Sequence, residues 1–227
     1  FASIIKKVSF ADDVSPKPYV SSKIKKTPPS VEKEFKSVYG RYKEAIYQFS
    51  QLPISVTPQI LSGGAFGLKE TSLFDIAITS PPYINAFDYA RSMRLENLWL
   101  GFTSEQGIRD GKKNYVGTES IKHSKNFGID DCITDSPLLL TCIEKLLKVD
   151  IKRAEIVHKF FVDMKLNMEL VMRALKPNGR YIIVIGNSSI RQIDIESWKV
   201  IKDIGLALGY KYESHFGYKI KNPYIRI

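Results

Sequence analysis

The fold is decided by residues 74–83, which read FDIAITSPPY. The first six are mostly apolar, and a short apolar run of this kind predicts a β-strand that is buried on both faces. Two prolines then end the strand, because proline has no N–H group to give to a strand ladder. We therefore expect a strand over 74–79 and a rigid turn over 80–83.

A second apolar run, RYIIVIG over 180–186, is the clearest strand in the sequence, because it is continuous and rich in β-branched residues. Helices are expected from Pro137 onward, and an apolar face from Ile151 to Leu175 predicts one long helix, which the stretch LKPNG at 175–179 ends. Further on we expect a helix that starts at Asp194 or Ser197 and ends at Gly209, then a strand over 212–220 and a strand stub at 225–227. Strands that alternate with helices predict an α/β fold with parallel strands.

The segments before and after the turn are less regular. Residues 30–49 carry apolar side chains every three or four positions, with Ser30 placed to start a helix, and 84–102 show a similar spacing. By contrast, 103–135 is polar and contains several glycines, which predicts a long irregular loop that acts as a lid or binding segment. Residues 1–30 are basic and contain prolines, so we expect an extended arm there.

Composition narrows the class of protein. The 227 residues fit one ordinary domain, and 44% of them are hydrophobic, which is enough for a packed core. Two cysteines exclude a disulfide framework, and three unspaced histidines give no reason to expect a metal site. The few cysteines fit a reducing, cytoplasmic compartment, and residues 1–10 are too short to form a secretory signal.

The formal net charge of +10 favours a polyanionic partner, because each lysine or arginine placed on a phosphate releases a counterion. A solvated basic surface explains the same charge equally well. The candidate contacts are Lys23, Lys25 and Lys26 in the arm and Lys112, Lys113, Lys122 and Lys125 in the long loop. We expect two parts, a basic arm and helix over 1–50 that contacts DNA or a protein partner, and a larger domain over 51–227.

The turn at 80–83 follows the carboxyl end of a strand, where α/β folds place their ligand crevice. Ser80 contributes a hydroxyl group, and Pro81 and Pro82 hold the backbone so that its carbonyl groups can accept hydrogen bonds from a ligand. Tyr83 contributes a flat ring that can stack on a base. The alternative is a proline-stiffened loop with a surface tyrosine.

Residues 74–83 resemble motif IV of the amino-group DNA methyltransferases. The serine at Ser80 is similar to that of the N4-cytosine subgroup, although some members with this serine act on adenine. A bacterial and archaeal branch of the family is also similar at NAFDYAR (85–91), LE (95–96), WLG (99–101) and LKPNGRYIIVIGNS (175–188). The resemblance covers about residues 70–227.

The resemblance implies the partial Rossmann-like sheet of a class I S-adenosylmethionine-dependent methyltransferase, with flanking helices. It also implies methylation of N4 of cytosine in double-stranded DNA, in a restriction-modification context. The hydroxyl of Ser80 and the carbonyl of Pro81 would accept the two amine hydrogens, Pro82 would shape the pocket, and Tyr83 would stack on the flipped-out base. Thr79 and Asn187 are candidates for the cofactor side of the site, and Asn85 for the DNA side.

The chain departs from the family in one respect, because the glycine-rich cofactor motif after the first strand is missing. The stretch SGGAFG at 62–67 is glycine-rich, but no apolar strand precedes it. We expect the cofactor-binding portion to lie upstream of these residues, on the same polypeptide or on a separate subunit. A carbon-5 cytosine mechanism is disfavoured, because neither Cys132 nor Cys142 follows a proline. Three alternatives remain open: adenine N6 as the target, an RNA guanine amine as the target, and an inactive DNA-binding or scaffold subunit.

Overall fold

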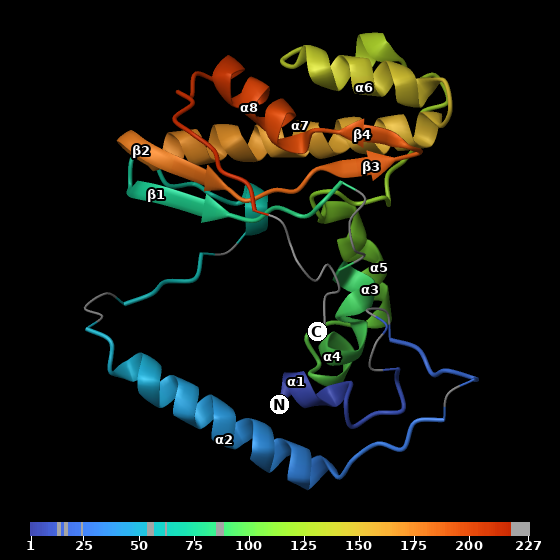
Figure 1. The fold of residues 1–227 in the computed structure, drawn as a ribbon, viewed down its shortest axis with the longest axis vertical. Helices are drawn as coiled ribbons and strands as arrows, with labels where there is room; N and C mark the ends of the chain where they lie inside the picture. Colours follow the sequence, from blue (N-terminus) through green and yellow to red (C-terminus); the bar gives the residue numbers. More distant parts are fainter. Residues whose placement is uncertain are drawn as a thin grey trace. The chain divides into compact units, whose positions relative to one another are not determined.

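The computed structural model describes residues 1–12, 15, 18–23, 25–53, 57–61, 63–84 and 89–218. The chain divides into two compact units, whose elements are labelled in Figure 1. The first unit comprises Phe1–Gln59, Asp88–Gly111 and Tyr218–Ile227, and the second comprises Ile60–Phe87 and Lys112–Gly217. Among the described residues, no helix combines the length and apolar character needed to cross a bilayer.

The first unit is helical. It contains α1 (Ala2–Ile5), α2 (Val31–Ser50), α3 (Tyr89–Ser92), α4 (Arg94–Trp99) and α5 (Glu105–Gly111). The predicted start of α2 is confirmed, because the side chain of Ser30 accepts a hydrogen bond from the amide of Lys33.

Three predictions for the first unit are wrong. Residues 1–30 are not an extended arm throughout, because α1 lies near their start and its Ile4 and Ile5 are buried. The described part of 84–102 forms two short helices instead of one, because Met93 leaves the helical conformation between them (φ −95°, ψ 12°). The segment after 102 is not irregular throughout, since α5 occupies its first part and Arg94 of α4 forms an ion pair with Glu105 of α5. Residues 85–88 lie outside the described part of the chain.

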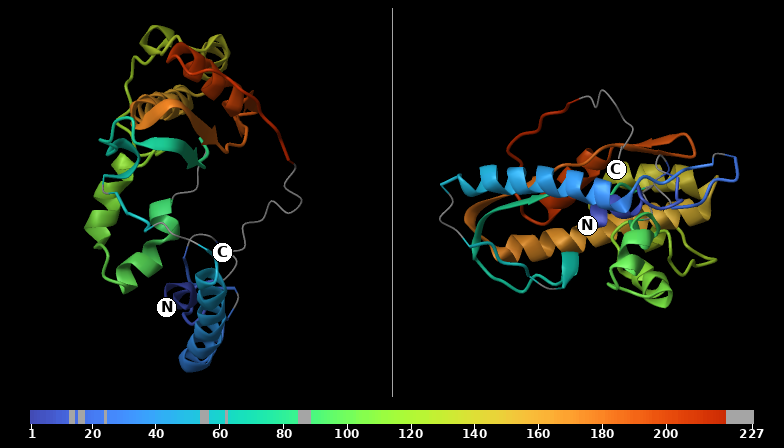
Figure 2. Two further views of the ribbon diagram at one scale, coloured as in Figure 1. Left: turned by 90° about the vertical axis from the view of Figure 1, so that its left-hand side faces the viewer. Right: turned by 90° about the horizontal axis from the view of Figure 1, so that it is seen from below.

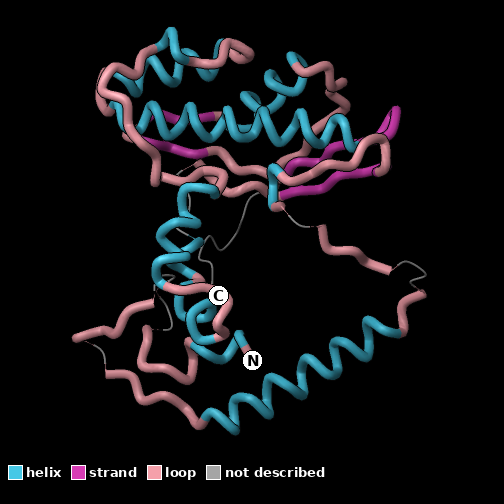
Figure 3. Tube along the Cα trace, turned by 180° about the vertical axis from the view of Figure 1, so that it is seen from behind, coloured by secondary structure: helices cyan, strands magenta, loops and turns pink. Residues whose placement is uncertain are grey.

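The second unit packs helices against strands. Its helices are α6 (Pro137–Leu147), α7 (Ile151–Ala174) and α8 (Ser197–Ala207), and its strands are β1 (Phe74–Thr79), β2 (Leu175–Ile183), β3 (Ser188–Ile190) and β4 (Ile193–Ile195). Single 3-10 turns lie at η1 (Gly64–Phe66), η2 (Lys112–Asn114) and η3 (Ile129–Asp131). Figures 1 and 3 show α7 running along both strand pairs, and in the left view of Figure 2 the three helices lie on one side of the strands.

The predicted parallel pairing is confirmed for β1 and β2. Their register joins Ile78 to Ile182 and Thr79 to Ile183. The core beneath them is formed mainly by α6, α7 and α8, where Leu139, Phe160 and Ile204 are fully buried. The amphipathic pattern of α7 therefore predicts its buried face correctly.

The prediction that β1 is buried on both faces is wrong for the described residues. Tyr181 and Ile183 on one face of the sheet pack against the core, but Ile76 and Ile78 on the other face are 53% and 70% exposed. Within the described chain β1 pairs only with β2, so its second edge has no strand beside it. Local apolar content predicts that a strand forms, but it does not show what covers each face.

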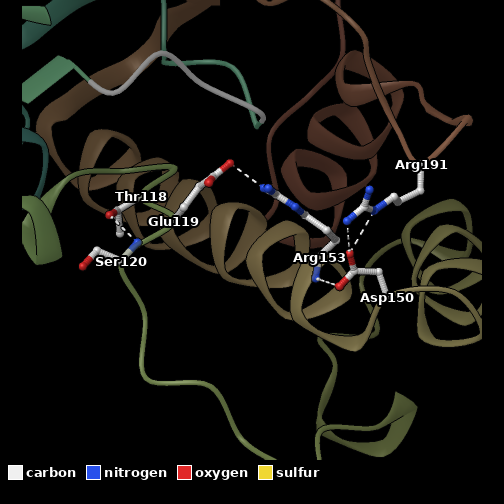
Figure 4. Close-up of polar contacts among 6 residues, drawn as sticks. All are labelled: Thr118, Glu119, Ser120, Asp150, Arg153 and Arg191. Atoms are coloured by element: carbon white, nitrogen blue, oxygen red, sulfur yellow. Dashed lines mark hydrogen bonds and ion pairs between the residues drawn. The ribbon is translucent and has the colours of Figure 1, made fainter. Parts of the chain in front are cut away.

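The hairpin of β3 and β4 was not predicted from the sequence. Its two turn residues, Arg191 and Gln192, have φ values of 52° and 63°, as a tight two-residue hairpin turn requires. Arg191 is held from outside the hairpin, since its Nε and Nη2 atoms donate to Oδ2 of Asp150 at 2.9 and 2.7 Å (Figure 4). The hydrogen bonds that Asp150 accepts, first those from Arg191 and then that from the amide of Arg153, lower its pKa below the usual value.

The carboxyl end of the second unit differs from the prediction at two places. Asp194 lies in β4 and Ser197 is already inside α8, whose N-cap residue is Glu196, so neither predicted cap is correct. The end of the helix is confirmed, because Gly209 adopts φ 98° directly after α8. The predicted strand is wrong over 212–218, where no strand forms, and 219–220 and 225–227 lie outside the described residues.

Candidate functional site

The candidate site begins where β1 ends. The amide of Val184 donates to the carbonyl oxygen of Thr79 at 2.9 Å, so β1 and β2 remain hydrogen-bonded up to this point. Ser80 follows immediately at the carboxyl end of the parallel pair. The strands therefore place the turn at 80–83 beside the segment that leaves β2.

The turn is anchored by some of its residues and open at others. Pro81 and Ile84 are buried, Pro82 is half-buried, and Ser80 and Tyr83 are exposed. Ile84 is 1% exposed and belongs to the main core cluster, whereas Tyr83 keeps 42% of its surface exposed. The backbone is thus fixed by buried neighbours while the hydroxyl group and the ring face outward.

Two oxygen atoms of the turn have no hydrogen-bond partner among the described residues. In the described part of the chain, no hydrogen bond is formed by the hydroxyl group of Ser80 or by the carbonyl oxygen of Pro81. Both atoms can accept hydrogen bonds, and they belong to consecutive residues. The turn can therefore present two neighbouring acceptors to one donor group that carries two hydrogens.

The ring of Tyr83 packs against the backbone at the exit of β2. A methyl group added at Gly186 would lie 2.9 Å from Cε1 of Tyr83, 3.6 Å from Cδ1 and 3.7 Å from Cζ. Asn187 follows Gly186 directly and is exposed. Two of the sequence segments that carry the family resemblance, 74–83 and 175–188, therefore meet at this ring.

The loop that begins at η2 approaches the same tyrosine from its backbone side. Gly117 is buried with φ 74°, and a methyl group added to it would lie 3.4 Å from the carbonyl oxygen of Tyr83 and 3.3 Å from Cδ2 of Phe160. Glycine adopts this φ without steric cost and also leaves the narrow gap unfilled. The loop is thereby seated between the turn and α7.

Further contacts hold this loop to α7. Glu119 forms an ion pair with Arg153 (Figure 4), and Nδ1 of His123 lies 2.8 Å from Oε2 of Glu155. The imidazole of His158 accepts a hydrogen bond at Nε2 from the amide of Ile133 at 3.1 Å. Burial lowers the pKa of His158, which favours the neutral ring that this bond requires.

The predicted DNA-contacting residues are unevenly placed. Lys113, Lys122 and Lys125 are exposed on the loop, whereas Lys112 is half-buried and has interaction partners. Lys26 is not free to meet a phosphate in this structure, because its ammonium group donates to the carbonyl oxygens of two residues of the first unit at 2.9 Å. Asn85 lies outside the described residues.

The glycine-rich stretch after residue 62 has a structural role here. The side chain of Asn167 donates from Nδ2 to the carbonyl oxygen of Ala65 at 2.7 Å. Its Oδ1 atom accepts a hydrogen bond from the hydroxyl group of Tyr181 at 2.7 Å. Burial raises the pKa of Tyr181 to about 12. The stretch is thus tied to α7 and β2, and no strand precedes it among the described residues.

The two cysteines are buried and free. Burial raises the pKa of Cys132 to about 11, and it raises that of Cys142 as well. A thiol attacks as its thiolate, so these environments oppose a nucleophilic role. Packing explains both residues.

Sequence reasoning missed three residues that shape the turn, namely Ile84, Gly117 and Gly186. Ile84 directly follows the motif, and its apolar character was the available signal for an anchor. The two glycines carried no local signal, because their neighbours come from distant parts of the chain.

Comparison with known proteins gives distant relatives. The chain is 27% identical over 151 residues to the type II methyltransferase M.MvaI of Kocuria varians, covering 64% of this chain and 32% of the relative. It is 24% identical over 189 residues to M.AvaI of Nostoc sp., covering 77% and 37%, and 24% identical over 209 residues to M.BsoBI of Geobacillus stearothermophilus, covering 78% and 41%. No family model and no solved structure matches. The chain is distantly related to these type II methyltransferases and spans about a third to two fifths of their length.

Proposed function

We propose that this chain carries the catalytic motif of an S-adenosylmethionine-dependent DNA methyltransferase that modifies N4 of cytosine in a restriction-modification context. The observation that carries the proposal is the arrangement of the turn after β1. Among the described residues, the hydroxyl group of Ser80 and the carbonyl oxygen of Pro81 have no hydrogen-bond partner, and both belong to the turn that carries the exposed Tyr83. The distant relationship to type II methyltransferases supports the same conclusion.

The chemistry follows from the weakness of the nucleophile. The lone pair of the cytosine amine is delocalised into the ring, so the nitrogen attacks poorly in its ground state. The hydroxyl oxygen of Ser80 and the carbonyl oxygen of Pro81 accept its two hydrogens, draw the nitrogen toward tetrahedral geometry and localise the pair. S-Adenosylmethionine supplies an electrophilic methyl group when it is bound. Tyr83 stacks on the extruded base and Pro82 shapes the pocket, so that the nitrogen is held in line for attack.

The glycine-rich motif that binds the cofactor in the family is missing from this sequence. Thr79 and Asn187 are the residues of this chain that would border it, while the glycine stretch at 63–67 is tied to Asn167 instead. We propose that the main cofactor-binding portion lies upstream of these residues or on a separate subunit.

The bare face of the strands supports this partner portion. Parallel sheets occur almost only with both faces covered, yet Ile78 is 70% and Val184 is 44% exposed here, and β1 has an unpaired edge within the described chain. In a Rossmann-like sheet, further strands would pair with that edge and helices would cover this face. We propose that the partner portion supplies both.

The polyanionic partner that we propose is double-stranded DNA. Lys113, Lys122 and Lys125 are exposed on the loop whose Gly117 lies near Tyr83, and the net charge of +10 suits a polyanion. The basic arm and helix over 1–50 would add contacts to DNA or to the partner portion. The relatives come from bacteria, and we place the activity in a prokaryotic cytoplasm.

Methyl transfer tests the proposal directly. The chain, combined with its cofactor-binding portion, is incubated with DNA and methyl-labelled cofactor, and the labelled base is identified after digestion. We expect N4-methylcytosine, and we expect Ser80→Ala to reduce the rate at least 100-fold, in the range that loss of one polarising group costs in enzymes. Ser189→Ala, at an exposed serine of β3, is the matched control and should leave the rate unchanged.

Other outcomes separate the alternatives. Recovery of N6-methyladenine would assign the same chemistry to adenine, and labelled guanosine in RNA would move the substrate class. An inactive scaffold remains the second candidate, favoured by the absence of the glycine motif. It predicts salt-sensitive DNA binding without cofactor binding. No transfer by a folded, complete protein would reject the enzyme and leave the scaffold.

A further inference from the structure

We infer that Gly186 is a positioning residue that sets where the ring of Tyr83 stands, and thereby how an extruded base is stacked. The inference deepens the proposed function, because it concerns the same turn. It depends on a contact between two segments that are far apart in sequence, the turn after β1 and the exit from β2.

The ring of Tyr83 lies so close to Gly186 that there is no room for a side chain at position 186. A methyl group there would lie 2.9 Å from Cε1 of Tyr83, and carbon atoms at van der Waals contact stand about 3.5–4.0 Å apart. The backbone of Gly186 does not lie in the left-handed region, so an alanine is compatible with its conformation. The added methyl group would therefore act on the tyrosine ring and not on the backbone.

The ring is the part that would give way. Tyr83 directly precedes buried Ile84 and lies two residues after buried Pro81, and its carbonyl oxygen faces Gly117. Tyr83 as a whole is 42% exposed, in contrast, so its ring has room to rotate toward solvent. Relief of the clash requires a ring displacement of about 0.6–1 Å, because the backbone beneath it is anchored.

A displacement of this size matters for a stacking group. An error of about 1 Å in the position of a reacting group can reduce a rate about 100-fold. The fold itself should be almost unaffected, since an exposed ring moves at little cost. Gly186→Ala is therefore expected to separate activity from stability.

Gly117 supports the same tyrosine from its carbonyl side, but it is a poorer test. Its φ of 74° makes any L side chain strained whatever the surrounding space. Loss of activity in Gly117→Ala would thus mix backbone strain with displacement of Tyr83. Gly186 isolates the contact with the ring.

The experiment introduces Gly186→Ala into three backgrounds of the complete protein: wild type, Tyr83→Phe and Tyr83→Ala. We expect kcat/KM for DNA to fall at least tenfold in the first two backgrounds, where a ring is present. In the Tyr83→Ala background the additional loss should be less than twofold, because no ring remains to be displaced. Gly217→Ala, at a glycine with open space around it, is the control and should change nothing.

A second readout does not depend on methyl transfer. Nitration of the phenol rings by tetranitromethane, read by peptide mass spectrometry, reports how exposed Tyr83 is. Tyr115, which is 47% exposed in the same unit, serves as the internal standard. We expect Gly186→Ala to raise the nitration rate of Tyr83 at least threefold relative to Tyr115, with the melting temperature unchanged.

The two readouts keep the two proposals apart. Faster nitration of Tyr83 in a protein that transfers no methyl group would uphold the contact and reject the proposed function. An equal activity loss in the wild-type and Tyr83→Ala backgrounds, or an unchanged nitration ratio, would overturn the role of Gly186 while leaving methyl transfer intact.

Discussion

Replacement of Ile84 by alanine should destabilise the second unit strongly. Ile84 is 1% exposed and lies in the main core cluster, directly after the turn that carries Ser80 and Tyr83. The substitution removes three buried carbon atoms, worth about 2.4 kcal/mol at roughly 0.8 kcal/mol each. The cavity that remains adds to this loss, so we expect a total of about 3–4 kcal/mol.

The assay is equilibrium unfolding in denaturant, followed by circular dichroism, together with thermal melting. A loss of about 3–4 kcal/mol corresponds to a fall in melting temperature of about 10 °C for a domain of this size. Ile60→Ala is the matched control, because the same atoms are removed from a side chain that is 101% exposed. Its free energy of unfolding should change by less than about 0.5 kcal/mol.

The comparison of the two isoleucines decides whether the turn is anchored. Equal shifts for Ile84→Ala and Ile60→Ala would show that Ile84 is not packed in the core. In that case the turn would not be fixed at its far end, and the outward placement of Ser80 and Tyr83 would lose its physical support.

Three further predictions concern stability and assembly. Ser136→Ala should cost about 2–3 kcal/mol in denaturant unfolding, because the buried hydroxyl caps α6 and donates to Asp203 at 2.6 Å; a loss below about 0.5 kcal/mol would contradict both bonds. Burial lowers the pKa of His158 in the folded protein, so the imidazole takes up its proton at a higher pH in the unfolded chain than in the folded one. The neutral His158 therefore contributes fully to the folding free energy above about pH 6.5, and this contribution is lost as the pH falls below that value. His158→Gln should flatten the melting temperature between pH 6.5 and 5, and an unchanged pH profile would oppose this origin. Ile78→Lys should leave the stability of this chain within about 0.5 kcal/mol, since the side chain is 70% exposed, but it should abolish methyl transfer by the complete protein; retained activity would show that this face is not covered.

The sequence predicts those parts of the fold that depend on neighbouring residues. β1, α2 and α7 form where periodicity and apolar runs indicate them, and Gly209 ends α8 as expected. Each of these elements is specified within a few turns or one short strand, so a local pattern is sufficient.

The failures have physical causes of a different kind. The β3–β4 turn uses Arg191 and Gln192 in place of the asparagine and glycine that mark such hairpins, and Asp150 from the start of α7 stabilises it. The expected strand after Gly209 has an apolar pattern, but no neighbouring strand pairs with it over 212–218. An apolar pattern in one segment does not ensure that another strand lies beside it to form hydrogen bonds.

The candidate site also has a part that the sequence predicts and a part that only the structure shows. Residues 79–83 became candidates because they follow a predicted strand and, together with that strand, resemble motif IV of the amino-group DNA methyltransferases. The structure adds that Pro81 is buried while Ser80 and Tyr83 are exposed, which the order does not predict. It also brings Gly186 to the ring of Tyr83, across more than a hundred residues.

The parallel pairing explains why a local motif becomes a candidate site. Two parallel strands end at the same edge, so the turn after β1 and the exit from β2 must lie side by side once Thr79 and Ile183 are in register. An antiparallel pair would place these segments at opposite ends, and Tyr83 could not rest on Gly186. The geometry of the turn therefore depends on the register of the two strands as much as on its own prolines. A shift of the strands by one residue would move the turn, with its acceptors, away from Gly186, which supports the ring of Tyr83, without any change in the motif itself.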